Sequence, residues 1–205
     1  MPVVVLISGR GSNLQAIAEA GLPVAAVISN RADAPGLALA RARGIATRVV
    51  SDKDHATREA FDAALAGEID RHAPQVVALA GFMRILGQAF VERYAGRLVN
   101  VHPSLLPAFT GLDTHARALA AGVKLHGCTV HGVTAELDRG PIIAQAAVPV
   151  RADDTPQTLA ARVLVQEHVI YPRAIRWMLE GRLVVENGVA RVRGNDAQLV
   201  FCSGD

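Results

Sequence analysis

An asparagine and a histidine lie two residues apart where an apolar stretch runs into a loop, in the segment RLVNVHPSLLP at 97–107. Successive side chains of a strand alternate between its faces, so Asn100 and His102 share one face and Val99 and Val101 the other. An amide can donate to an oxygen that becomes negative during a reaction, and an imidazole can move a proton near neutral pH. The pair fits reactive chemistry at a strand end. The alternative is that both side chains satisfy backbone groups of the loop.

A glycine-rich turn, SGRGSN at 8–13, follows the β-branched run Val3–Ile7 and precedes a stretch with helical spacing at 14–20. This order exposes backbone N–H groups at a helix N-terminus, where an anion is favoured. The turn lacks the Gly-Lys-Ser/Thr of a P-loop. A dinucleotide-binding turn would have a third glycine where this chain has Leu14 and an acidic residue where it has Asn30, so that kind of site does not fit either. The alternative to a ligand site is a tight turn whose polar residues cap the helix. A phosphate monoester fits better, held by Gly11, Ser12 and Asn13.

The first half of the chain alternates strand and helix patterns. We expect strands near 24–28, 47–50 and 75–81, and helices near 36–43 and 55–71. Such alternation predicts a Rossmann-like α/β fold, with a mostly parallel twisted sheet and helices on both faces. Ligands of such folds bind at the carboxyl ends of the strands. The turn at 9–13, the segment at 82–86 and the Asn100–His102 pair are therefore expected on one rim.

Two further segments have open interpretations. Residues 82–86, FMRIL, place large apolar side chains beside one cation, which indicates either core packing or a slot for a flat heterocycle. The loop at 108–115 combines a glycine with polar residues, and it is either a lid over a substrate or an ordinary surface loop.

The second half begins its regular structure with strand patterns at 127–134 and 141–150. Their connection is too short for a helical crossover, which predicts an antiparallel pair. Asp138 lies in that connection, as a turn residue or as a carboxylate that faces His102 and supports its protonated form. A hairpin with an Asn-Gly turn is expected at 183–192, and the tail beyond Gly194 gives no prediction.

A long helix is expected to begin near Thr155-Pro156, and Pro172 should end or kink it. Glu167 falls inside the apolar stripe of this helix. A carboxylate there needs a partner, which is a ligand hydroxyl, a neighbouring charged group or solvent at the rim. The stripe consists of Leu159, Val163, Ile170, Ala174 and Trp177.

Composition narrows the function classes. The chain has 205 residues, of which 51% are hydrophobic and 20% charged, which predicts a compact globular protein. Its formal net charge of +2 comes without a cationic run, so no nucleic-acid partner is expected. There is no membrane-span pattern and no export signal at the start. Cys128 and Cys202 lack metal-type spacing, and His126 and His131 point to opposite strand faces, so we expect no metal, free thiols and a cytoplasmic location.

Taken together, these stretches resemble the phosphoribosylglycinamide formyltransferases, a folate-dependent family of purine synthesis. The resemblance runs in order through nearly the whole chain, at residues 5–15, 79–86, 100–107, 127–131, 137–138 and 166–168. It implies one formyltransferase domain over 1–205, with a phosphate-binding half at about 1–100 and a catalytic and folate half at about 101–205.

The resemblance also implies residue roles. Asn100, His102 and Asp138 would be the catalytic group. The substrate phosphate would be held by Gly11, Ser12 and Asn13, and the ribose by Glu167. Formylfolate would be contacted by Arg58, Met83, Arg84, Ile85, Leu86 and Asn100. The chain departs from the family pattern at Gly132, where an aromatic residue is usual, at Arg139, where a small one is usual, and at Asp113, where some members have histidine.

The implied reaction transfers a formyl group from 10-formyltetrahydrofolate, the cosubstrate, to the glycinamide amine of phosphoribosylglycinamide. The implied partners are small molecules, and the implied state is a monomer or homodimer. Methionyl-tRNA formyltransferase and formyltetrahydrofolate hydrolase carry similar segments, but each has an additional domain that 205 residues do not accommodate. A non-catalytic module that binds a phosphate ligand is the alternative from another class.

Overall fold

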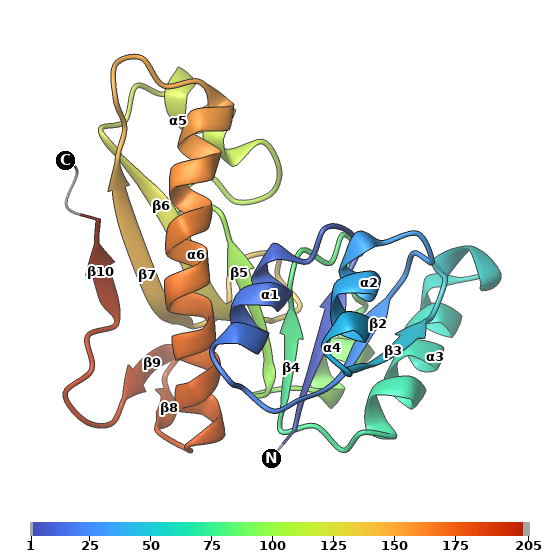
Figure 1. Cartoon of the computed structure of the whole chain (residues 1–205). Coiled ribbons are helices and arrows are strands. Elements are labelled where there is room, and N and C mark those ends of the chain that lie inside the picture. The colour runs from blue at the N-terminus through green and yellow to red at the C-terminus, as the bar shows by residue number, and fades with distance from the viewer. Residues whose placement is uncertain (1, 203–205) are drawn as a thin grey trace. The chain divides into compact units, whose positions relative to one another are not determined.

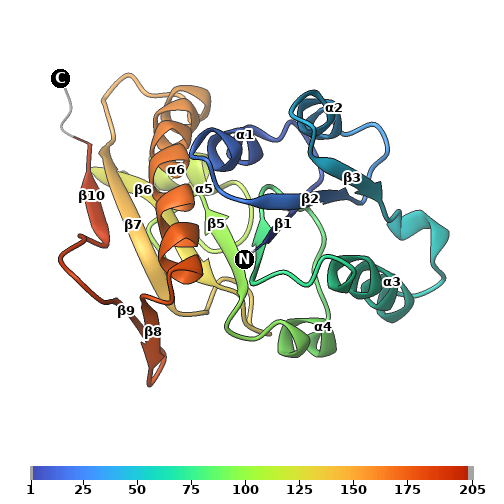
Figure 2. The same cartoon turned by 60° about the horizontal axis from the view of Figure 1, so that its bottom comes forward.

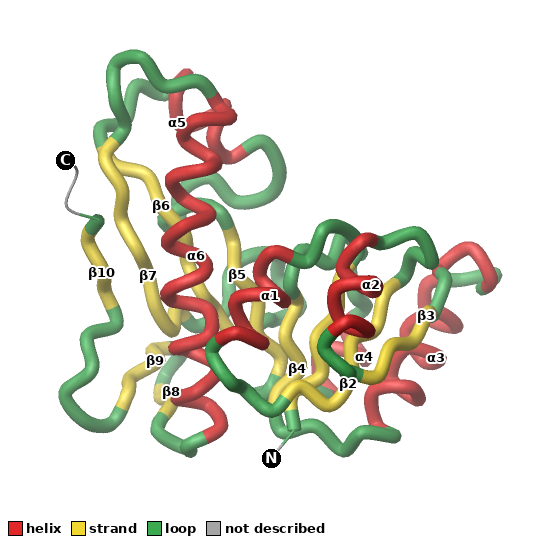
Figure 3. Tube along the Cα trace, in the orientation of Figure 1, coloured by secondary structure: helices red, strands yellow, loops and turns green. Residues whose placement is uncertain are grey.

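A computed structural model describes residues 2–202, and the chain divides after Asn100 into two compact units (Figure 1). Each unit is built from strands with helices packed on them, as the colouring by secondary structure in Figure 3 shows. The expected α/β class is therefore confirmed. Within the described residues, no helix combines the length and the apolar character that a membrane crossing requires.

The first unit is organised around β1 (Val3–Ile7), whose residues are all fully buried. A parallel strand covered on both faces needs such a continuous apolar run. The strands run parallel in the order β5–β4–β1–β2–β3, with β2 at Val24–Ser29, β3 at Ala46–Val49, β4 at Val76–Leu79 and β5 at Leu98–His102. One face carries α1 and α2, and the other carries α3 and α4 (Figure 2). These helices span Ser12–Glu19, Pro35–Ala42, Arg58–Asp70 and Gln88–Arg93, and a 3₁₀ turn covers Asp52–Asp54.

The second unit contains the antiparallel pair predicted from the short connection, β6 (Leu125–Gly132) and β7 (Ile142–Pro149). Helix α6 (Pro156–Leu179) packs along both strands (Figure 1). Its predicted apolar stripe is buried throughout. The remaining elements are α5 (Thr114–Ala120), the hairpin of β8 (Leu183–Glu186) and β9 (Val189–Val192), and β10 (Leu199–Phe201), which runs parallel to β7.

Several predictions from the sequence need correction or addition. Pro172 does not end the long helix, because α6 continues through it to Leu179. The loss of one backbone donor is outweighed there by the burial of neighbouring apolar residues, including Ile170, Tyr171 and Ala174. The short helix α4 was not expected, and neither was β10 in the tail. Cys128 is buried and Cys202 is partly exposed, and within residues 2–202 the two form no disulfide.

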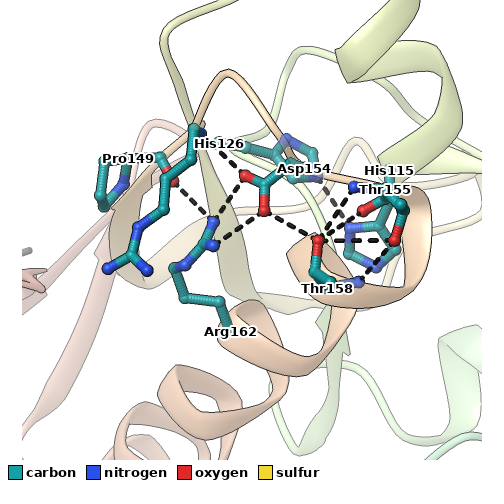
Figure 4. A network of polar contacts seen from close by, with 8 residues as sticks. His115, His126, Pro149, Asp154, Thr155, Thr158 and Arg162 are labelled. Carbon is teal, nitrogen blue, oxygen red and sulfur yellow. Dashed lines mark hydrogen bonds and ion pairs between the residues drawn. The ribbon is translucent and has the colours of Figure 1, made fainter.

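The start of α6 is fixed by a polar network around Asp154 (Figure 4). Thr155 is the N-cap, and its side chain and that of Thr158 exchange hydrogen bonds with each other's backbone N–H groups. The guanidinium of Arg162 donates to both oxygens of Asp154 at 2.8 Å and to the Pro149 carbonyl at 2.9 Å. Because these bonds favour the ionised carboxyl group, they hold the pKa of Asp154 well below its ordinary value.

Replacing Arg162 by alanine is expected to lower the free energy of unfolding at pH 7 by about 2 kcal/mol, since it leaves the buried Asp154 charge without its bidentate partner. The Asp154 side chain is only 2% exposed. A carboxyl group with a depressed pKa stabilises the fold above about pH 4 and loses this contribution as the pH falls further. Urea unfolding should therefore show a difference between variant and parent at pH 7 that shrinks below pH 4. Arg31→Ala, which breaks an exposed pair with Asp33, is the control and should change nothing measurable.

Candidate active site

His102 and Asp138, which lie far apart in the sequence, meet in the second unit. The Nδ1 atom of His102 lies 3.6 Å from Oδ2 of Asp138, and both side chains are more than nine-tenths buried. His102 ends β5, and Asp138 lies in the turn between β6 and β7 with a left-handed backbone, φ 54°. Asp138 is thus both the turn residue and the carboxylate facing His102, which the sequence had left as alternatives.

The second ring nitrogen of His102 is also occupied. Its Nε2 lies 3.0 Å from the carbonyl oxygen of Phe109, and because a carbonyl can only accept, Nε2 carries a proton and donates it. The other nitrogen faces a carboxylate, which accepts as well. The imidazole therefore lies between two acceptors in a buried site at the end of β5.

Asp138 receives three groups, two of which the sequence did not predict. The backbone N–H of Gly111 donates to Oδ2 at 2.9 Å, and Nε2 of His131 lies 3.7 Å from Oδ1. Burial lowers the pKa of His131. The loop at 108–115 thus contacts both members of the pair through its backbone. The Gly111 contact could not be predicted from the sequence, because a backbone N–H is present whatever the residue type. The His131 contact could have been considered, because a histidine in a strand pattern is a possible partner for a carboxylate.

The loop that follows His102 is anchored to β6 and β7. The hydroxyl of Thr129 donates to the Ser104 carbonyl at 2.7 Å and accepts from the Leu106 N–H at 3.0 Å. The amide of Gln145 donates to the Leu106 carbonyl and to Thr129. These bonds fix the backbone immediately after His102, so the position of the imidazole at the end of β5 is constrained.

His126 and His115 lie behind this loop, with Nε2 of His126 3.2 Å from Nδ1 of His115 (Figure 4). The Phe109 ring packs edge-on against His126. Burial lowers the pKa of His126 to about 4, helped by the neighbouring His115. His126 is therefore neutral at physiological pH and serves as packing for Phe109, whose carbonyl His102 contacts.

Asn100 lies two residues before His102 in β5 and pairs with Leu79 of β4. It is partly exposed, whereas Val99 and Val101 are buried. Asn100 is the one partly exposed residue of β5, and His102 lies two positions further along the same strand.

The glycine-rich turn of the first unit leads from β1 into α1. Gly11 is the helix N-cap and has a left-handed backbone, φ 78°, with no side-chain cap on the helix. A Cβ atom on Gly11 would come within 2.9 Å of the Cα of Gly36, and the Gly36 N–H donates to the Gly9 carbonyl. Ser12 opens the helix and Asn13 is buried. The first turn therefore presents uncapped backbone N–H groups, as an anion site requires.

The segment at 82–86 leaves large apolar side chains in solvent. Met83 is 66% exposed and Ile85 71%, so packing into the core does not account for them. Arg58 opens α3 and lines a cavity of about 540 Å³ between α3 and α4. Beneath it, the buried carboxylate of Asp62 accepts the Gly87 N–H at 2.7 Å and thereby fixes the start of α4.

Glu167 is buried in α6 at 8% exposed, so exposure to solvent at the rim is ruled out for it. Burial raises the pKa of the Cys128 thiol and of the Tyr171 hydroxyl, and the Glu167 charge raises both further. Among the described residues, no group of three or more histidine, cysteine, aspartate or glutamate side chains is placed to hold a metal ion.

Comparisons with known proteins decide the family. Residues 1–175 match the family described as formyl transferase. The chain belongs to the formyl transferase family. Phosphoribosylglycinamide formyltransferase of Escherichia coli strain K12 is 54% identical over 200 residues, covering 95% of this chain and 94% of that protein.

Solved structures of formyl transferases agree in fold. The phosphoribosylglycinamide formyltransferase of Coxiella burnetii, solved with CHES, has a TM-score of 0.90 and 49% identity, covering 94% of this chain and 93% of its own. The enzyme of Anaplasma phagocytophilum has a TM-score of 0.92 and 43% identity, covering 98% of both chains. The expected resemblance and fold class are thus confirmed for this formyl transferase.

The three positions at which we expect departures from the family pattern all belong to the second unit. Gly132 ends β6, where an added Cβ would make only an ordinary contact with Pro141, so its lack of a side chain is not forced by crowding. Arg139 is exposed beside Asp138. Asp113 is the N-cap of α5 in a left-handed conformation, φ 55°, which aspartate tolerates better than most residues.

Proposed function

We propose that this formyl transferase moves the formyl group of 10-formyltetrahydrofolate to the glycinamide amine of 5'-phosphoribosylglycinamide, a step of purine biosynthesis. The observation that carries the proposal is the buried His102–Asp138 pair at the end of β5, in a chain 54% identical to an enzyme named for this reaction. The products are formylglycinamide ribonucleotide and tetrahydrofolate.

In the proposed mechanism, the amine nitrogen attacks the formyl carbon and forms a tetrahedral intermediate with a negatively charged oxygen. In the substrate complex the formyl oxygen takes the place of the Phe109 carbonyl at Nε2 of His102. The protonated ring, which still faces Asp138 through Nδ1, then donates to that oxygen together with the Asn100 amide. The bond from the formyl carbon to N10 then breaks, and the proton lost by the amine passes to N10. Asp138 keeps His102 charged or positions a water that carries the proton. Each donor to such an oxygen contributes about 3 kcal/mol.

The remaining roles are proposed on the same basis. Gly11, Ser12 and Asn13 bind the substrate phosphate at the N-terminus of α1, and Glu167 meets the ribose. Formylfolate is contacted by the exposed segment of Met83, Arg84, Ile85 and Leu86, by Arg58 and by Asn100. We further propose that 1–205 functions as one formyltransferase domain, in the cytoplasm, without a metal, as a monomer or homodimer.

Replacing Gly11 by alanine is expected to raise KM for phosphoribosylglycinamide about tenfold or more, since the strained backbone costs about 1–2 kcal/mol and the methyl group crowds Gly36 at 2.9 Å. Steady-state kinetics measures the effect. Gly21→Ala is the matched control, because Gly21 also has a positive φ of 71° but no heavy atom within 4 Å of the added carbon. A KM equal to the parent's in Gly11→Ala would remove the turn from the substrate site.

The proposed function is tested with the purified chain, both substrates, and detection of tetrahydrofolate and formylated amine. Both products should appear together and only when the amine is present. Tetrahydrofolate with free formate in the absence of the amine would instead identify a hydrolase. Calorimetric binding of phosphoribosylglycinamide without any transfer would identify a binding module.

A further inference from the structure

A hydrogen-bonded circuit in the first unit joins the residue before the glycine-rich turn to the exposed segment at 83–86. The Ser8 hydroxyl donates to Oδ1 of Asn30 at 2.6 Å and accepts the Met83 N–H at 2.8 Å. The Asn30 amide donates in turn to Oδ1 of Asp52 at 3.0 Å. The other oxygen of Asp52 lies 3.3 Å from Nη1 of Arg84. Because Met83 and Arg84 are neighbours in the sequence, the circuit closes on itself.

Burial makes this circuit selective. Ser8 and Asn30 are more than nine-tenths buried, so neither can exchange its partner for water without cost. The orientation of the Asn30 amide is fixed by its two neighbours: its oxygen accepts from Ser8 and its nitrogen donates to Asp52. The Asn30 hydrogen bond and the Arg84 charge lower the pKa of Asp52, so its carboxylate stays ionised at neutral pH. Bonds polarised in one direction reinforce one another.

The segment at 83–86 lies between two hydrogen-bonded points of the first unit. The ladder between β1 and β4 continues through Ala80 and Gly81, whose groups bond to Leu6 and Ser8. Beyond it, Met83 and Ile85 extend into solvent until Asp62 receives the Gly87 N–H. An exposed apolar segment that is ordered before its ligand arrives loses less conformational entropy on binding.

We propose that Ser8, Asn30 and Asp52 are positioning residues, which hold the Met83–Leu86 segment in the conformation that binds formylfolate. The inference rests on the proposed function for the identity of the ligand. It assigns a role to Asn30, which follows β2 and which the sequence analysis used only to exclude a dinucleotide site. It also assigns a role to Asp52, which forms an ion pair with Arg84.

The test is a kinetic and exchange comparison of Asp52→Asn and Ser8→Ala with the parent. Asp52→Asn keeps an acceptor for Asn30 but removes the charge facing Arg84, and Ser8→Ala removes the anchor of Met83. KM for 10-formyltetrahydrofolate is expected to rise about fivefold to tenfold in each, with kcat within about twofold. KM for phosphoribosylglycinamide should stay within about twofold in Asp52→Asn. Hydrogen exchange at the Met83 amide should quicken, and the thermal midpoint should change little in Asp52→Asn.

Asp33→Asn is the matched control, because Asp33 is an exposed carboxylate that follows the same strand and pairs with Arg31. It should leave both KM values and Met83 exchange unchanged. An unchanged formylfolate KM in Asp52→Asn and Ser8→Ala, with a fully active parent, would overturn the positioning role and leave the proposed function intact. A parent chain without formyl transfer would instead overturn the proposed function itself.

Discussion

Replacing His102 by alanine is expected to lower kcat for formyl transfer by about 10²- to 10³-fold, the loss typical of one removed donor to a developing oxyanion. The imidazole is buried, and its nitrogens face the Phe109 carbonyl and the Asp138 carboxylate. Alanine has no side-chain hydrogen-bond donor, so the variant lacks this donor. KM for both substrates should change far less than kcat, because the interaction strengthens in the transition state rather than in the ground state.

Steady-state kinetics on the folded variant measures this loss. His72→Ala is the control, since His72 follows α3 beside Glu68, outside the proposed catalytic group. It should retain the parent's kcat. A His102→Ala variant with more than about a third of the parent's turnover would remove His102 from the chemistry.

Replacing Asp138 by asparagine is expected to lower kcat by about 10²-fold, because the amide cannot supply the negative charge that faces His102. The change is conservative in other respects. Asparagine tolerates the left-handed backbone of this position, and its oxygen can still accept the Gly111 N–H. The variant should therefore fold, and circular dichroism with thermal unfolding checks that it does.

Asp153→Asn, an exposed carboxylate of the same unit, is the control and should leave kcat unchanged. Equal turnover of Asp138→Asn and the parent would mean that the contact with His102 is structural. A lowered kcat with a greatly raised KM for one substrate would point to binding rather than to support of the imidazole.

The strands and most helices of this fold follow from local patterns. β1 has the same bounds in prediction and structure, because its apolar run begins after Pro2 and stops at Ser8-Gly9, which mark both ends of the strand. The prediction that the long helix ends at Pro172 is wrong. The cost of one missing N–H is local and can be read from the sequence, whereas the burial of α6 against β6 and β7 cannot. The elements α4 and β10 are too short for periodicity to reveal, and tertiary contacts stabilise them.

In the candidate site, too, some contacts follow from the sequence and others depend on the folded chain. Alternation along β5 predicted the shared face of Asn100 and His102, and the family resemblance pointed to Asp138. The Phe109 carbonyl and the Gly111 N–H are backbone groups, so their contacts with His102 and Asp138 depend on loop shape. The circuit of Ser8, Asn30 and Asp52 joins three segments through hydrogen bonds whose partners only the folded chain brings together.

The coupling between His102 and Asp138 is the central claim, and a double-mutant cycle on kcat measures it directly. If Asp138 acts by holding His102 in its charged, donating state, then Asp138→Asn has little left to remove once the imidazole is gone. The double variant should therefore be about as slow as His102→Ala alone. A double variant slowed by the product of the two single effects would show that the two residues act independently, and would contradict the mechanism proposed for this formyl transferase.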